Sequence, residues 1–275
     1  MAWDVDIAHL TYHYTRGSSA AIEDVSCRVA SGSILAVIGP GGAGKTTLLF
    51  ALAGILGKQP HAAASGRTRL GPREYFPFPD EPLFPDVGML LQDPHVLLSG
   101  LAETVEEEIL FGVRNAGWEL PEAVGRIDSV LTELDMAPFR SRRVTSLSEG
   151  ELQKVALAAV LSVRPSLVLL DEPASSLDGN AHAAVARILR SSRGDTTTIF
   201  TDTDLELAFE CADNVIVLDG GRCVFYGPFG QFLRQLKEFE DILPIGRWTS
   251  ALSCMEDPVT EPSTRRRCER LMRLA

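Results

Sequence analysis

A glycine-rich segment between an apolar run and a helix-like run places the strongest constraint on this chain. Residues 33–39 read SILAVIG, and residues 39–46 read GPGGAGKT, which fits the pattern G-x-x-x-x-G-K-[ST]. The apolar run predicts a buried strand, and KTTLLFALAGIL at 45–56 predicts a helix. Glycines in such a loop let backbone N–H groups turn inward around phosphate oxygens, and the helix N-terminus adds the positive end of a dipole. The segment therefore predicts a phosphate-binding strand–loop–helix unit.

Two side chains at the end of this loop suit a magnesium nucleotide. Lys45 supplies a point charge for the β- and γ-phosphates, and Thr46 offers a hydroxyl oxygen to Mg²⁺. The alternative, a glycine-rich turn that binds no ligand, is disfavoured by the motifs that follow along the chain. We therefore expect the nucleotide to bind at Gly39, Pro40, Gly41, Gly42, Ala43, Gly44, Lys45, Thr46 and Thr47.

A second apolar run ends in two carboxylates. Residues 166–172 read SLVLLDE, which predicts a buried strand with Asp171 at its end. Asp171 can reach the Mg²⁺ shell, and Glu172 is placed to polarise an attacking water. An acidic pair after a strand is weak evidence alone, but here it follows a phosphate loop and precedes PASSLD at 173–178.

The remaining pattern predicts an α/β domain with a mainly parallel sheet. Further apolar runs at 196–202 and 214–221 predict strands, residues 3–14 have strand-like character, and residues 99–161 are mostly helical in pattern. Strands that alternate with helices favour parallel pairing. Residues 57–88 contain several prolines, and we expect loops or edge strands there.

Composition argues against several classes of function. The chain has 275 residues and a formal net charge of −11, which argues against a nucleic-acid binder and against direct adsorption to anionic lipid. It has no run of about 18 apolar residues, so no segment is predicted to span a bilayer. The start, MAWDVDIAHL, lacks the basic and apolar regions of a signal peptide. The five cysteines form no Cys-x-x-Cys pair, which favours reduced thiols in a cytoplasmic protein.

These motifs, in this order, resemble those of the ATP-binding cassette (ABC) ATPases. The resemblance covers about residues 3–240 and rests on GPGGAGKTT at 39–47, LLQDP at 90–94, SLSEGELQKVALAAVLSVRPSLVLLDEP at 146–173, SSLD at 175–178 and NVIVLDGG at 214–221. It implies an α/β P-loop NTPase fold with a RecA-like, mainly parallel sheet core, an antiparallel β subdomain and a helical signature subdomain at about 93–161. The ABC ATPase domain would be residues 1–240, and a tail at 241–275 would contain a linker-like segment and a short basic helix.

In this family two cassettes sandwich two ATP molecules head to tail, each between the phosphate loop of one chain and the signature of the other. The resemblance implies that Tyr14 stacks on adenine, with a strand aromatic that packs inward as the alternative. Gln92 resembles the glutamine that touches Mg²⁺ and the water and links to the transport partner. The implied sites are a catalytic set of Glu172, Gln92 and Thr203, a metal set of Thr46, Gln92 and Asp171, contacts to the partner's nucleotide at Ser148, Glu149, Gly150 and Glu151, and a dimer-facing Asp178.

The segment after Gln92 is similar to that of energy-coupling-factor importers, which take up vitamins and transition-metal ions. Residues 104–109 read TVEEEI, and in that group a groove here receives an arginine-bearing coupling helix of the membrane subunit. The resemblance implies an integral-membrane partner that docks near Gln92 and Glu106–Glu108, and a location on the cytoplasmic face of the cell membrane. A solvated acidic helix face is the alternative for these glutamates.

The signature departs from the family pattern LSGGQ, because residues 147–151 read LSEGE. Ser148 and Glu151 form an S-x-x-E capping box, which predicts a well-specified helix start. A carboxylate ~6 Å from a phosphate charge costs about 3 kcal/mol at an effective dielectric near 20. Glu149 and Glu151 therefore weaken the grip on ATP if they face the nucleotide, whereas screening removes most of this cost if they point to solvent.

A second departure lies at residues 201–204, which read TDTD. Family members commonly read T-H-D with the histidine on the γ-phosphate, and Asp204 takes the aspartate's place because it lies nine residues before Asp213. Thr203 therefore occupies the histidine position, and none of the five histidines can replace it by sequence position. Threonine can donate one hydrogen bond but cannot become cationic. We predict a site that binds Mg-ATP and hydrolyses it slowly.

This departure favours a heterodimer with a second ABC ATPase subunit, since a homodimer would carry it in both sites. The expected function is ATP binding and hydrolysis that drive import of a small nutrient through a membrane partner. The alternatives are an ATPase of another ABC importer or exporter class, a soluble ABC ATPase that acts on DNA or ribosomes, and a regulatory ATP binder. The acidic charge disfavours the soluble class. The sequence leaves the cargo open.

Overall fold

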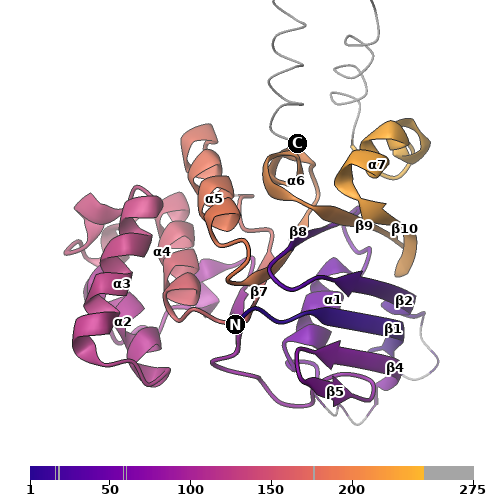
Figure 1. Ribbon diagram of the computed structural model, residues 1–275, viewed down its shortest axis with the longest axis horizontal. Coiled ribbons are helices and arrows are strands. Elements are labelled where there is room, and N and C mark those ends of the chain that lie inside the picture. Colours follow the sequence, from indigo (N-terminus) through magenta and orange to yellow (C-terminus); the bar gives the residue numbers. More distant parts are fainter. Residues whose placement is uncertain (16, 18, 58, 60, 176, 245–275) are drawn as a thin grey trace, which may run out of the picture.

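A ten-stranded sheet runs through the structure (Figure 1). The computed structural model describes residues 1–244 except residues 16, 18, 58, 60 and 176. The linker-like segment and basic helix predicted near the end of the chain lie outside the described residues. The strand order is β5-β4-β1-β2-β10-β9-β3-β8-β7-β6, which places an antiparallel half beside a mainly parallel core.

The core strands pair in parallel. β3 (Ile34–Ile38) lies between β8 (Thr197–Asp202) and β9 (Asn214–Asp219), and β7 (Leu167–Asp171) lies between β8 and β6 (Val87–Leu90). Every residue of β3 and β7 is buried, as expected for strands whose two faces are both covered. The structure thus confirms the buried strands predicted at 33–39, 166–172, 196–202 and 214–221.

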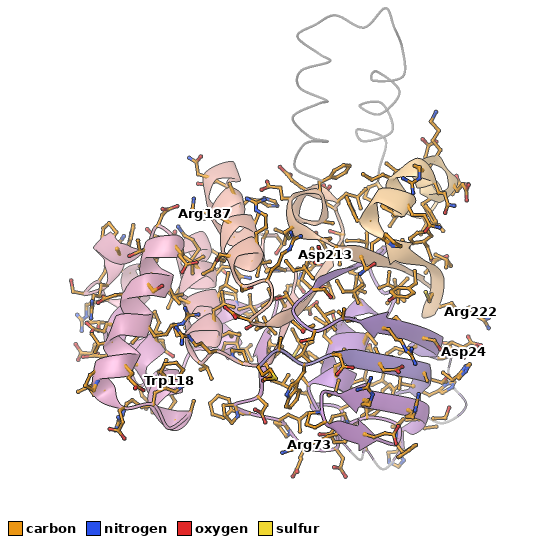
Figure 2. The ribbon with its side chains drawn as sticks, in the orientation of Figure 1. Asp24, Arg73, Trp118, Arg187, Asp213 and Arg222 are labelled. Carbon is orange, nitrogen blue, oxygen red and sulfur yellow. The ribbon has the colours of Figure 1, made fainter. Side chains whose placement is uncertain are left out.

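The antiparallel half is built around β1 (Val5–His13). This strand lies between β2 (Ile22–Val29) and β4 (Ala63–Leu70), and β4 also pairs with β5 (Arg73–Tyr75). β10 (Arg222–Pro228) forms a hairpin with β9 and meets β2 at the junction of the two halves. At that junction lies Arg222, which Figure 2 labels. Its Nε donates to Glu23 Oε2 over 3.1 Å, so an ion pair joins the halves.

β4 differs from the expectation for its segment. Loops or edge strands were the expectation at 57–88, but β4 lies inside the sheet. Its sequence alternates the partly exposed Arg67 and Arg69 with the buried Thr68 and Leu70. An antiparallel strand with one face towards solvent needs only one buried face, so its sequence lacks a continuous apolar run.

Helices cover both faces of the sheet. α1 (Lys45–Leu52) follows the phosphate loop, and its apolar residues share one core cluster with the antiparallel strands. A second cluster joins the other face of the parallel strands to the remaining helices. These include α5 (Gly179–Ser191), α6 (Glu206–Cys211) and α7 (Phe229–Arg234). Short 3-10 turns are η1 (Pro94–Val96), η2 (Ala137–Phe139), η3 (Val144–Ser146) and η4 (Leu236–Phe239).

Three helices stand together beyond the β7–β6 side of the sheet, at the left of Figure 1. They are α2 (Val105–Asn115), α3 (Leu120–Glu133) and α4 (Glu149–Ser162). Thr104 and Ser148 begin α2 and α4 with capping boxes, so the box predicted at Ser148 is confirmed. Within the part of the chain that the structure describes, no helix has both the length and the apolar character needed to cross a membrane.

Candidate nucleotide-binding site

The phosphate loop connects β3 to α1 and is enclosed by backbone of β9 and of the residue that precedes β2. A Cβ atom at Gly39 would lie 2.3 Å from the carbonyl oxygen of Leu218, which belongs to β9. Gly44 has φ +96°, and a Cβ atom there would lie 2.2 Å from the carbonyl oxygen of Ala21. These contacts are shorter than any side chain allows, so both positions require glycine and the loop is held between the two halves of the sheet.

Lys45 lies under this loop. Its side chain is buried, and Nζ donates hydrogen bonds to the carbonyl oxygens of Gly39 at 2.7 Å and Pro40 at 3.1 Å. Burial lowers the pKa of Lys45, while the nearby carboxylates of Glu172, Asp171 and Asp202 act in the opposite direction. The loop therefore surrounds an ammonium group that faces a cluster of carboxylates, an arrangement that suits a phosphate chain with a divalent ion.

Asp171 joins the phosphate loop to the centre of the sheet. Its Oδ2 accepts a 2.9 Å hydrogen bond from the hydroxyl of Thr46, and its Oδ1 accepts one of 2.6 Å from the hydroxyl of Thr201. A hydroxyl and a carboxylate side by side are the hard oxygen ligands that Mg²⁺ prefers. Two residues of the metal set expected from sequence, Thr46 and Asp171, thus lie in direct contact.

Glu172 and Gln92 face each other across this site. Gln92 follows β6, and its Nε2 donates a 2.9 Å hydrogen bond to Glu172 Oε2. The backbone N–H of Glu172 donates to the hydroxyl of Thr201 at 3.0 Å. Glu172 has φ +48°, a left-handed conformation that costs of order 1–3 kcal/mol for a residue other than glycine. The hydrogen bond from its N–H to Thr201 holds the strained backbone, and the hydrogen bond from Gln92 orients the carboxylate.

Tyr14 has the exposure expected of an aromatic that stacks on a base. Its side chain is 46% exposed, whereas its neighbour Tyr12 is 1% exposed and packs into the core. The two rings meet edge to face with centroids 5.0 Å apart, and Tyr14 Oη lies 3.0 Å from Thr47 Oγ1. Tyr14 therefore lies next to α1, the helix that follows the phosphate loop. The aromatic that packs inward is Tyr12.

The TDTD segment turns around Asp202. Thr203 is exposed, and its backbone N–H donates to Asp202 Oδ1 at 2.7 Å, as does that of Asp204 at 3.1 Å. Burial raises the pKa of Asp202 to about 6, although these two hydrogen bonds oppose the shift. The nearby charge of Glu172 adds to the increase. The motif predicts a role for Thr203 but none for Asp202, whose position beside the loop follows from its pairing with Ile38.

The two signature glutamates both find partners within the chain. Ser148 caps α4, and its N–H donates to Glu151 Oε2 at 2.7 Å. Glu151 Oε1 also accepts a 3.2 Å hydrogen bond from Arg142, and these contacts lower its pKa. Glu149 Oε2 lies 3.4 Å from His95 Nε2. Asp178 caps α5 by accepting the N–H of Ala181 at 2.9 Å.

The three glutamates at the start of α2 do not form a free acidic surface. Glu106 pairs with Arg140, and Glu107 completes the capping box with Thr104. Glu108 is buried and accepts hydrogen bonds from Ser99 N at 2.6 Å and Ser99 Oγ at 2.8 Å. Glu107 is exposed, Glu106 is partly exposed and Glu108 is buried, so the three carboxylates do not share one solvated face. A docking role for this segment stays a prediction.

The outer side of α2 forms a groove of about 400 Å³. Leu101, Leu110 and Phe111 supply apolar walls, and Glu107 and Arg114 supply charged groups. Phe111 is 45% exposed and Leu101 is 79% exposed, so two large apolar side chains of this groove face solvent together.

Comparison with known proteins places the chain in a family. The family model described as ABC transporter matches residues 22–175, more than half of the chain. The energy-coupling factor transporter ATP-binding protein EcfA1 of Levilactobacillus brevis is 33% identical over 222 residues, which cover 80% of this chain and 77% of that protein. The cobalt import ATP-binding protein CbiO of Rhodobacter capsulatus is 35% identical over 221 residues, which cover 79% and 76%.

Solved structures agree with the fold. The cbiO1 protein from Clostridium perfringens, described as part of the ABC transporter complex cbiONQ, has a TM-score of 0.65 at 24% identity, covering 86% of this chain and 95% of that chain. A nucleotide-free ATP-binding cassette from an ABC transporter has a TM-score of 0.69 at 20% identity. The expected α/β P-loop fold is therefore confirmed. This chain belongs to the ABC transporter family and is an ATP-binding, ATP-hydrolysing subunit of the energy-coupling factor type.

Proposed function

We propose that this chain binds and hydrolyses Mg-ATP in a head-to-tail cassette dimer and thereby drives import of a small nutrient through a membrane partner. The observation that carries the proposal is the continuous set of hydrogen bonds from Thr46 through Asp171 and Thr201 to Glu172 and Gln92. It brings together four separate segments of the chain at the mouth of the phosphate loop. The relative named for cobalt import supports a transition-metal ion as cargo, and the resemblance to energy-coupling-factor importers keeps a vitamin as the alternative.

The residues of the nucleotide-binding site have distinct roles in the proposed reaction. The loop N–H groups and Lys45 bind the β- and γ-phosphates, and Thr46, Gln92 and Asp171 would hold Mg²⁺. Bound Mg²⁺ supplies positive charge that neutralises the phosphate oxygens during transfer. Glu172 polarises a water whose oxygen attacks the γ-phosphorus, and its carboxylate accepts the proton that the water loses. The bond from the γ-phosphorus to the β–γ bridging oxygen breaks, which releases ADP and inorganic phosphate. Tyr14 stacks on the adenine ring.

Thr203 makes the two sites of the dimer unequal in this proposal. Its side chain is neutral and short, so it supplies at most one hydrogen bond where a histidine can reach the γ-phosphate. The site on this chain's phosphate loop then turns over slowly. A heterodimer with a second ABC ATPase subunit retains one fast site, and Ser148, Gly150 and Asp178 of this chain would serve that partner's nucleotide and the dimer interface.

The membrane partner would dock on the groove beside α2, next to the loop that carries Gln92. Apolar side chains of a coupling helix fit Leu101 and Phe111, and its charged groups fit Glu107 and Arg114. Of the three glutamates expected to dock, Glu107 lines this groove, whereas Glu106 pairs with Arg140 and Glu108 is buried. Such docking holds the chain at the cytoplasmic face of the membrane.

The test is reconstitution with the cassette and the integral-membrane protein encoded by neighbouring genes. We expect a stable complex with both proteins, and ATP hydrolysis that rises when the membrane partner is present. A dimer formed by this chain alone with fully active sites would contradict the heterodimer. ATP binding without hydrolysis in every combination would favour the second candidate, a regulatory ATP binder, which Thr203 permits and Glu172 opposes.

A further inference from the structure

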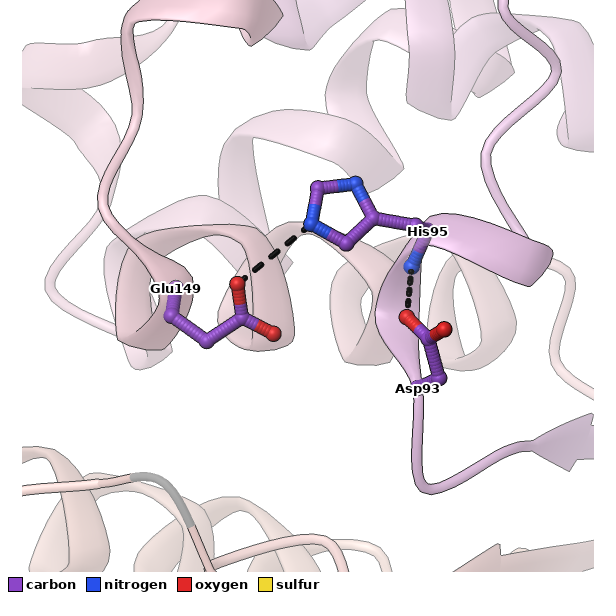
Figure 3. A group of neighbouring side chains, drawn as sticks. All are labelled: Asp93, His95 and Glu149. Carbon is purple, nitrogen blue, oxygen red and sulfur yellow. Dashed lines mark hydrogen bonds and ion pairs between the residues drawn. The ribbon is translucent and has the colours of Figure 1, made fainter.

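Three metal-ligating side chains from two separate segments converge beside the signature helix (Figure 3). Asp93 and His95 lie on the short turn after Gln92, and Glu149 is the first residue of α4. Their ligand atoms all lie within 4.8 Å of one another, and each residue is exposed. In Figure 3 the imidazole of His95 lies between the two carboxylates. None of the three belongs to the proposed Mg²⁺ set.

The geometry of the closest pair fits a shared metal ion. His95 Nε2 and Glu149 Oε2 are 3.4 Å apart. Two ligands bound tetrahedrally at about 2.1 Å from one ion stand ~3.4 Å apart, and the usual zinc–nitrogen and zinc–oxygen distances are of that size. The same contact would be an ion pair only with a protonated imidazole. The neutral imidazole is the form that ligates a metal.

The arrangement also restricts where the ligands can move. Asp93 Oδ1 accepts the backbone N–H of His95 at 2.9 Å, so one carboxylate oxygen stays beside the turn and the other is left to ligate. Glu149 starts a helix that is fixed by the capping box between Ser148 and Glu151. Positive charge near a helix N-terminus is disfavoured by the macrodipole, but three acidic residues, Asp93, Glu149 and Glu151, outweigh that effect here.

We propose that Asp93, His95 and Glu149 bind a divalent transition-metal ion such as Zn²⁺. Imidazole with two carboxylates suits zinc, cobalt and nickel, while Mg²⁺ and Ca²⁺ take oxygen ligands. The bound ion ties the turn after Gln92 to the first residue of the signature helix. It thereby couples the loop that contacts Glu172 to the helix expected to contact the partner's nucleotide. Binding of the ion requires neither nucleotide nor a partner subunit.

The test is a Zn²⁺ titration of the full chain with ¹⁵N-labelled histidine, in excess Mg²⁺ and without nucleotide. The chain has five histidines, so each ring can be followed separately. We expect Zn²⁺ to shift the ring nitrogens of His95 at lower concentration than those of the other histidines. Glu149→Gln and Asp93→Asn should each raise the half-saturating concentration at His95 by about 10-fold or more.

The matched control is His9→Gln. His9 is an exposed histidine that also pairs with a carboxylate, and its Nδ1 lies 2.7 Å from Asp24 Oδ1. Among the described residues it belongs to no group of three metal-ligating side chains. This variant should leave the Zn²⁺ response of His95 unchanged. Zinc held by cysteine thiols does not move the His95 ring. A His95 ring that does not respond, or whose half-saturation is the same in Glu149→Gln, overturns the proposal.

Discussion

The hydroxyl of Thr201 donates a 2.6 Å hydrogen bond to Asp171 Oδ1 across the interior of the sheet. Thr201 and Asp171 are register partners on the paired strands β8 and β7. The same hydroxyl accepts the N–H of Glu172, so one side chain fixes both the carboxylate proposed for Mg²⁺ and the backbone of the proposed base. Thr201 is therefore a buried positioning residue that acts on the site through Asp171 and the backbone of Glu172.

Replacing Thr201 by valine should destabilise the chain and slow its reaction. Thr201 is 0% exposed, and valine keeps its volume but leaves Asp171 Oδ1 and the Glu172 N–H without this partner. A buried group left unsatisfied costs about 1–3 kcal/mol, which urea unfolding would measure. Thr198→Val is the matched control, because Thr198 lies on the same strand and its buried hydroxyl has no hydrogen-bond partner among the described residues. Equal losses in both variants would contradict the proposed role.

Restoring histidine at residue 203 should accelerate ATP hydrolysis at this chain's own site. An imidazole can contact the γ-phosphate and orient the water, and a positioned proton-transfer group contributes of order 10²–10⁴-fold. We expect Thr203→His to raise the single-turnover rate by about 10-fold or more in the reconstituted dimer. Thr203→Ser keeps a hydroxyl and should leave the rate near that of the unmodified chain. No gain with histidine would mean that Thr203 is not what limits turnover.

Stability should depend on the charge of Asp202. Its folded pKa of about 6 exceeds the ordinary value of 3.8, so the folded chain binds this proton more tightly. The contribution of Asp202 to stability is then full below about pH 4 and is lost as pH rises through about 6. Two pKa units correspond to roughly 3 kcal/mol.

Asp202→Asn removes this charge and keeps an oxygen for the N–H groups of Thr203 and Asp204. Its free energy of unfolding in urea should exceed that of the unmodified chain by roughly 1–3 kcal/mol at about pH 7.5, and the gain should shrink towards pH 4. Asp219→Asn, at the exposed end of β9, serves as the control and should show no such pH-dependent gain. A gain that is the same at both pH values would contradict the assignment to Asp202.

A charge in the groove beside α2 should block docking of the membrane partner. Phe111→Asp places a carboxylate among the apolar walls of the groove, and a central interface anchor is worth about 2 kcal/mol or more. We expect affinity for the partner to fall by about 10-fold or more, with nucleotide binding retained. Val224→Asp changes an equally exposed apolar residue, 45% in both cases, on β10 away from the groove. Loss of docking in both variants would point to a general effect of the added charge.

The parallel core and the phosphate loop could be predicted because their sequences carry strong local signals. β3 and β7 are continuous apolar runs, and the loop has residues whose types and spacing are dictated by phosphate chemistry. β2 and β4 lack such a signal, because only one face of each is buried and charged residues occupy the other. Their place in the sheet depends on pairing with β1, which no local pattern encodes.

Within the site, the residues that touch phosphate or metal follow from motif, but those that hold them do not. Thr201 and Asp202 act through strand register, since each faces a residue distant in sequence on β7 or β3. The surroundings of two glutamates of α2 could not be predicted for a similar reason. Glu106 pairs with Arg140 and Glu108 accepts hydrogen bonds from Ser99, and both partners come from outside the helix.

Gly39 and Gly44 are required by the packing of the loop against Leu218 and Ala21, whether or not a nucleotide is bound. A descendant of this chain that lost ATP binding would still need both glycines to keep this loop packed between its two half-sheets. Persistence of these glycines in related sequences therefore reports on architecture. Evidence of retained catalysis must come instead from Lys45, Asp171 and Glu172. Among the described residues, no backbone atom packed against these positions excludes other residue types in the way that Leu218 and Ala21 exclude a Cβ atom at the two glycines.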